Sequence, residues 1–114
     1  MSLRTVRLAE APVVLTDGVH RLRYDLNALA LLEEGTGQDI VSLTGQLQQG
    51  KVSALRAFLW AGLAHEGPKP KSMEQIGALV PIHALGDLIA AITQALSDSL
   101  PETQEGDKQA GNPT

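Results

Sequence analysis

The segment from Lys51 to Glu66, KVSALRAFLWAGLAHE, constrains the fold more than any other part of the chain. Large apolar residues recur in it at helical spacing, at Val52, Leu55, Leu59 and Leu63. It also holds Phe58 and Trp60, two of the three aromatic residues of the protein. Aromatic side chains bury large apolar areas. Because glycine precedes the segment and Gly-Pro follows it, we predict a central helix in which Phe58 and Trp60 are structural.

Length and composition predict one globular domain. The chain has 114 residues, of which 43% are hydrophobic and 19% charged, enough to bury a single core. A formal net charge of −4 gives no general attraction to nucleic acid or anionic membranes. The absence of cysteine excludes disulfides and thiolate metal sites. With no signal-peptide pattern or long apolar run, we expect a cytoplasmic protein, in the host cell if it is phage-encoded.

The N-terminal part has the pattern of a small antiparallel sheet. Polar and apolar residues alternate from 3 to 8, which predicts an edge strand. Asp17-Gly18 lies between two β-rich runs, and this pair favours a hairpin with a type I′ turn. Leu22 and Tyr24 are expected to face inward, and the arginines at 21 and 23 outward.

From Asp25 onward, the apolar residues recur at the spacing of helices rather than of strands. Asp25 is predicted to cap a first helix that ends near 35–37, and Thr36 or Asp39 to open a second one. Ser72 and Gln75 have the spacing of a capping box, and Pro81 suits the first turn of a last helix. The fold class we predict is α+β, with the N-terminal hairpin sheet packed against a bundle of about four to five helices.

The last predicted helix carries an apolar seam whose members step by three and four residues: Ile82, Leu85, Ile89, Ile92 and Leu96. One interpretation is core packing against the central helix, and the other is that part of the seam binds a partner. We take these five residues as the candidate partner-binding residues. Residues 102–114 contain no large apolar side chain, so we predict a single domain over 1–101 and a disordered polar tail.

The histidines do not form a recognisable metal site. His65-Glu66 begins like the zinc motif H-E-x-x-H, but Lys69 stands where the second histidine is required. His20 and His83 have no suitably spaced ligands beside them and are predicted to be surface residues.

The sequence also contains no recognisable catalytic or phosphate-binding motif. The glycines at 35 and 37 follow a helix rather than a strand, so capping explains them better than a phosphate loop. Glu33 and Glu34 are adjacent and do not share a helical face. We therefore predict no catalytic residues, no cofactor and no metal, and regard the chain as non-enzymatic.

Two basic features remain to be considered, and each is only a pair, at 21 and 23 on the hairpin and at 69 and 71 in the following loop. Nucleic-acid interfaces usually need more positive charge, supported by aromatic residues. A small adaptor or DNA-binding regulatory domain, with the two middle helices as a helix-turn-helix, remains the alternative function, although no basic recognition helix is present.

Two segments together resemble the tail assembly chaperones of long-tailed phages and gene transfer agents: LRYDLNALALLEEGTG at 22–37 and ALRAFLWAGLAHE at 54–66. The resemblance covers about residues 13–100 in order and spacing. It implies a protein encoded among tail genes, absent from the finished virion, that binds the tape measure protein during tail assembly. The tail tube protein is a further candidate partner. We expect the apolar helical surface to bind the partner and to form homo-oligomers in the free protein.

Overall fold

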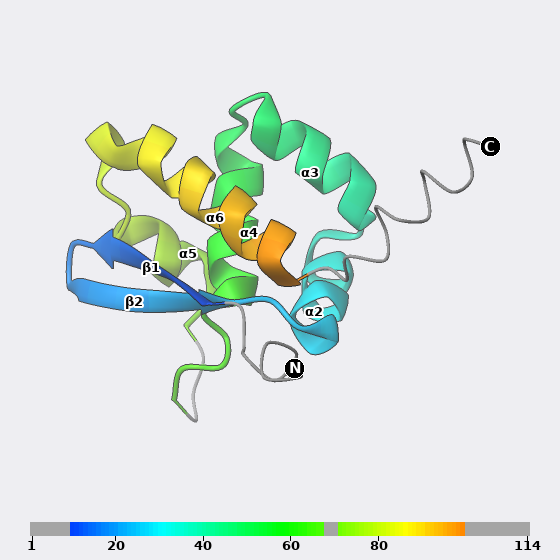
Figure 1. The fold of residues 1–114 in the computed structure, drawn as a ribbon, viewed down its shortest axis with the longest axis horizontal. Helices are drawn as coiled ribbons and strands as arrows, with labels where there is room; N and C mark the ends of the chain where they lie inside the picture. The colour runs from blue at the N-terminus through cyan, green and yellow to red at the C-terminus, as the bar shows by residue number, and fades with distance from the viewer. Residues whose placement is uncertain (1–9, 68–70, 100–114) are drawn as a thin grey trace, which may run out of the picture.

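The computed structural model describes residues 10–67 and 71–99, the side chains of 98 and 99 excepted. The elements follow in the order β1 (Glu10–Leu15), β2 (Gly18–Arg23), α2 (Leu26–Thr36), α3 (Ile40–Gln48), α4 (Val52–Gly62), α5 (Met73–Ala78), a 3-10 turn η1 (Ile82–Ala84) and α6 (Leu85–Ser99) (Figure 1). This arrangement confirms the α+β fold class. The strand predicted at 3–8 and the tail predicted at 102–114 lie outside the described residues.

Helix α4 is the centre of the fold, as its sequence predicts. It contacts α2, α3, α5, α6 and β2, while α6 packs along β1 (Figure 1). Phe58 and Leu59 are fully buried, and Leu55 and Leu63 nearly so. Helix α4 ends at Gly62 rather than at 66, and a turn completes the predicted segment. None of the helices in the described ranges is both long and apolar enough to cross a membrane.

The hairpin is present, but its turn differs from the prediction. Strands β1 and β2 pair antiparallel from Leu15 opposite Gly18 to Glu10 opposite Arg23, and Leu22 and Tyr24 point into the core. The two residues between the strands are Thr16 and Asp17, and within the described residues only glycines have positive φ. A type I′ turn needs positive φ at both central positions, which is unfavourable for threonine. The type I′ assignment is therefore wrong.

The caps predicted at Asp25, Asp39 and Ser72 are confirmed, whereas Pro81 precedes the 3-10 turn η1 and does not lie in the first turn of α6, which begins only at Leu85. The carboxylate of Asp25 accepts a hydrogen bond from the Ala28 amide at 2.9 Å, and Asp39 accepts one from the Ser42 amide at 2.7 Å. Asp39, rather than Thr36, therefore opens α3. At α5 both halves of the predicted capping box are formed.

Candidate partner-binding surface

The predicted apolar seam of the last helix is divided by the fold. Ile92 and Leu96 are buried, with 0% and 8% of their surface exposed, and belong to the core. Leu85 and Ile89 are half-buried at its edge, whereas Ile82 is 77% exposed. Only the N-terminal end of the seam is therefore open to a partner in this structure.

The buried stripe of α6 also includes residues that the seam omitted. Leu88 and Ala95 are 3% and 1% exposed. Helix α6 packs against both β1 and α4, so it buries a stripe wider than the narrow one that alternating steps of three and four select. Leu88 was identifiable as a large apolar residue three positions after Leu85, and Ala95 carried no comparable signal.

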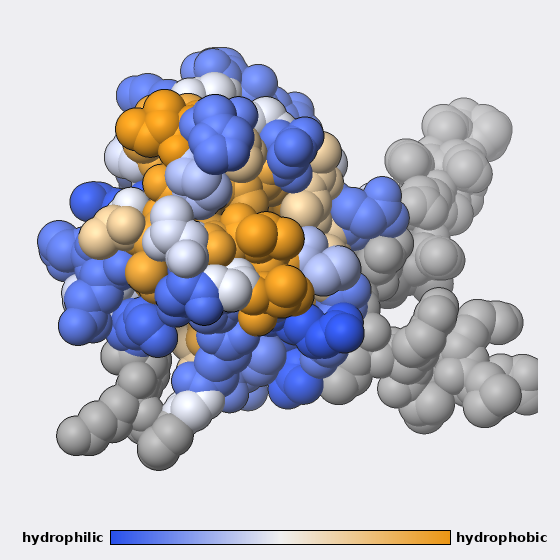
Figure 2. Space-filling model, turned by 90° about the vertical axis from the view of Figure 1, so that its left-hand side faces the viewer, coloured by the Kyte–Doolittle hydropathy of each residue, from blue (hydrophilic) through white to orange (hydrophobic). Residues whose placement is uncertain are grey.

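The open end of the seam forms one wall of an apolar groove of about 280 Å³. The groove lies between the start of α4, the end of α5, η1 and the start of α6, and its lining residues are Val52, Leu55, Arg56, Gly77, Val80, Ile82 and Leu85. Figure 2 shows apolar residues gathered on the side of the molecule that carries the hairpin turn and the start of α6. We refer to this feature as the α4–α6 groove.

Val52 and Ile82 distinguish this groove from ordinary surface. The sequence places Val52 on the buried face of the central helix, but it is 62% exposed, whereas Ala54 and Leu55 of the same turn are buried. Other large exposed apolar residues, such as Leu26 and Val41, lie on other elements. Single exposed apolar residues are common on soluble proteins. Two of them at the rim of one apolar groove are a stronger indication of a binding surface.

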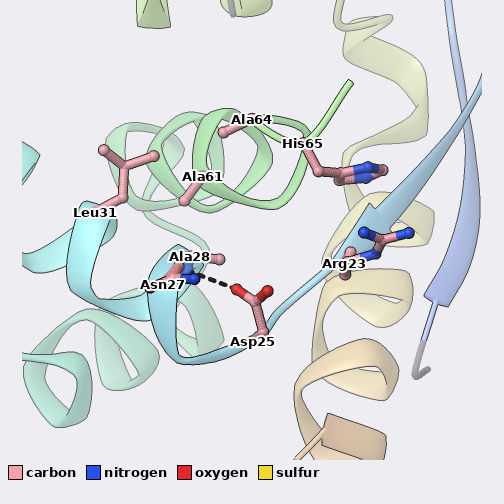
Figure 3. Close-up of a pocket in the computed structure, with 8 residues that line it drawn as sticks. All are labelled: Arg23, Asp25, Asn27, Ala28, Leu31, Ala61, Ala64 and His65. Carbon is pink, nitrogen blue, oxygen red and sulfur yellow. Dashed lines mark hydrogen bonds between the residues drawn. The ribbon is translucent and has the colours of Figure 1, made fainter. Parts of the chain in front are cut away.

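A second hollow, of about 240 Å³, is lined by charged and small side chains: Arg23, Asp25, Asn27, Ala28, Leu31, Ala61, Ala64 and His65 (Figure 3). Its charged groups already have structural partners. The guanidinium of Arg23 pairs with the Glu10 carboxylate at 2.7 Å, and Asp25 caps α2. The ring of His65 bonds the carbonyl oxygen of Arg21 at 2.8 Å. The lining therefore offers no nucleophile paired with a free base.

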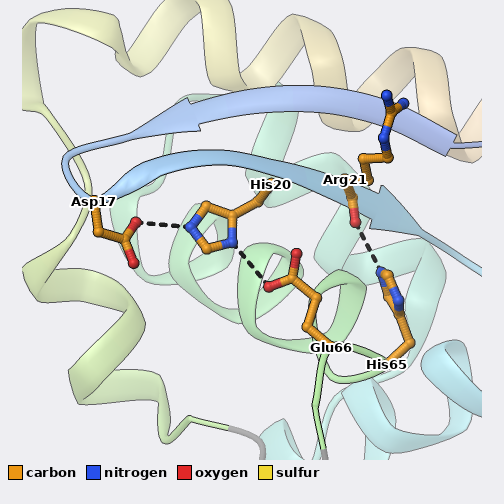
Figure 4. A network of polar contacts seen from close by, with 5 residues as sticks. All are labelled: Asp17, His20, Arg21, His65 and Glu66. Atoms are coloured by element: carbon orange, nitrogen blue, oxygen red, sulfur yellow. Dashed lines mark hydrogen bonds and ion pairs between the residues drawn. The ribbon is translucent and has the colours of Figure 1, made fainter.

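His20 is less exposed than the surface position predicted for it, with only 12% of its side chain exposed. Its ring lies between two carboxylates, with Nε2 2.7 Å from Asp17 and Nδ1 2.8 Å from Glu66 (Figure 4). Burial lowers the pKa of His20, but hydrogen bonds to the two carboxylates outweigh burial and raise that pKa above its ordinary value. The spacing of Asp17 and His20 was a local signal; Glu66 is 46 residues away and gave none.

This network is structural in character, since it joins the hairpin to the segment after α4. His83 is exposed, as predicted. In the ranges 10–67 and 71–99, the structure contains no group of three or more His, Cys, Asp or Glu residues arranged to hold a metal ion.

Comparison with protein families relates this chain to proteins of phage tails. A family model described as "Phage tail tube protein, GTA-gp10" matches residues 8–102, which is most of the chain. Comparison with curated proteins found no match, and comparison with solved structures found none.

Proposed function

The chain belongs to the phage tail tube protein family, GTA-gp10, and on that premise we propose that it is a non-enzymatic tail assembly chaperone that binds the tape measure protein. Membership places it among proteins of tail structure and assembly. The chaperone role within that group is the interpretation that we favour.

The observation that carries the proposal is the open α4–α6 groove. Exposed apolar surface that is concentrated at one site marks an interaction surface on a soluble domain. Helix-in-groove binding places apolar residues of an amphipathic helix into such a groove. A tape measure protein is long and helical, and its apolar stripe requires cover until the tube surrounds it.

The charge of the chain supports the same role. The formal net charge is −4, and like charge on many bound copies would keep an apolar helical protein dispersed. The DNA-binding alternative gains no support, because α2 and α3 contain no lysine or arginine.

The family's description as a tail tube protein favours a second candidate function, that of a tail tube subunit. The two functions differ in the fate of the protein. A tube subunit remains in the finished particle in a ratio fixed by the tube, whereas a chaperone leaves before assembly is complete.

Co-expression tests the chaperone proposal. The tape measure protein encoded beside this gene is produced with and without this chain, and its soluble fraction is measured. We expect the tape measure protein to be soluble only when the chain is present and to co-purify with it. Equal solubility in both cultures, with no co-purification, would refute the proposal.

A further inference from the structure

Arg56 is the one charged residue in the lining of the α4–α6 groove. Its aliphatic part lies against Gly77 of α5, where an added Cβ would be 3.1 Å from Arg56 Cδ. The Nε of Arg56 is buried and has no hydrogen-bond partner. In the part of the chain that the structure describes, no carboxylate forms an ion pair with this guanidinium. The groove therefore combines apolar walls with an uncompensated cation.

The surroundings of the groove on α4 are also positive, although the whole chain is acidic. Lys51 occupies the N-cap position of α4 and makes no side-chain capping bond. The sequence of α4, VSALRAFLWAG, contains no acidic residue. The free amides of a helix N-terminus carry partial positive charge. A ligand that fits both the shape and the charge of this site is apolar with an acidic border.

We propose that the α4–α6 groove binds an amphipathic helix of the tape measure protein, whose apolar side chains enter between Val52 and Ile82 and whose bordering carboxylate pairs with Arg56. This inference rests on the function proposed above and specifies where and by what chemistry the partner binds. The groove, at about 280 Å³, is smaller than the roughly 300–1,000 Å³ of pockets that enclose whole small molecules. It suits a few side chains of a helix.

The guanidinium of Arg56 gives the groove its selectivity, because it favours ligands that carry a carboxylate. Arginine forms strong, oriented hydrogen bonds with carboxylates. Apolar contact alone would accept any helix with an apolar face. An unpaired guanidinium favours a helix that also places a hydrogen-bond acceptor at the edge of the groove.

Two exposed valines allow a matched test in the full chain. Val52 and Val41 are 62% and 82% exposed, and both lie in the first turn of a helix, but only Val52 lines the groove. Aspartate is tolerated in a first helical turn, so Val52→Asp and Val41→Asp should both fold. Ile82→Asp changes the opposite wall. Circular dichroism melting checks that each variant is folded.

The probe is a set of overlapping synthetic peptides that covers the tape measure protein, with binding followed by fluorescence anisotropy. We expect Val52→Asp and Ile82→Asp to raise the Kd of the best peptide at least about tenfold, because substitutions at the centre of an interface have large effects. Val41→Asp should leave that Kd unchanged. Arg56→Gln should weaken binding about three- to tenfold and reduce its salt dependence, while Arg56→Lys retains most of that dependence.

Each contrary result identifies what fails. If wild type binds the peptides and the groove variants bind equally well, the groove proposal is wrong while the chaperone function stands. If Arg56→Gln binds like wild type, the carboxylate pairing is wrong. If the groove variants convert an oligomer into a monomer without weakening peptide binding, a second copy of this chain occupies the groove and the proposal is overturned. If wild type binds neither peptides nor intact tape measure protein, the proposed function fails as well.

Discussion

The hydroxyl of Tyr24 donates a hydrogen bond to the backbone carbonyl of Phe58 at 2.5 Å, and this contact joins the end of the hairpin to the centre of α4. The two rings also meet edge to face, with centroids 6.2 Å apart. Both side chains are buried. Burial raises the pKa of the Tyr24 hydroxyl well above its ordinary value, so the group stays a neutral donor.

Removing this donor should weaken the domain modestly. Tyr24→Phe retains the ring and deletes one buried hydrogen bond, which contributes about 1 kcal/mol in proteins. Urea unfolding followed by Trp60 fluorescence measures the loss. An unchanged unfolding free energy would show that the hydrogen bond contributes nothing to stability.

Gly62 should be intolerant of any side chain. A Cβ there would lie 2.7 Å from the Tyr24 ring and 2.9 Å from Leu22, closer than packed atoms allow. Gly62→Ala should therefore destabilise the fold by about 1–3 kcal/mol. The matched control is Gly45→Ala in α3, where nothing lies within 4 Å and alanine should stabilise the helix by roughly 0.5–1 kcal/mol. Equal effects in the two variants would contradict the close packing of α4 on the hairpin.

Replacing the two aromatic residues of α4 by alanine should lower the unfolding free energy by different amounts. Phe58 is 0% exposed, so Phe58→Ala should lose about 3–5 kcal/mol and leave little stability. Trp60 is only half-buried and packs over Gly35, so the two residues predicted to be structural are not equally buried. Trp60→Ala should remain folded with a smaller loss, measured by circular dichroism. A complete loss of structure in that variant would place Trp60 at the core.

The environment of His20 predicts that the unfolding free energy falls as the pH rises above the ordinary pKa of histidine. Its pKa in the folded protein is raised by Asp17 and Glu66. Between the ordinary and the raised pKa, the folded state holds a proton that the unfolded state has released. The stabilisation is complete below the ordinary pKa and is lost as the pH rises through the folded one.

Unfolding free energies measured from about pH 5 to about pH 8.5 test this dependence. His20→Gln should flatten the decline, and Asp17→Asn should reduce it, since one of the two carboxylates remains. If His20→Gln shows the same decline as wild type, another group controls it.

The sequence predicted local features well and tertiary ones less well. The caps at Asp25 and Ser72 depend on residues three positions apart, so spacing was sufficient to find them. Exposure along η1 and α6 depends on where β1 and α4 lie. Helical periodicity assigned Ile82 and Ile92 to the same apolar face, although Ile82 in η1 is exposed and Ile92 in α6 is buried. The partnership of His20 with Glu66 depends on how the hairpin packs, which no local pattern reports.

Mass-spectrometric quantification in the producing cells tests the central claim most directly. The chain is measured in tape measure complexes isolated during assembly and in purified finished particles. We predict many copies in the complexes and none in the particles. Copies retained in the finished particle in a fixed ratio to the tail, with none in the complexes, would identify a tube subunit and contradict the chaperone account.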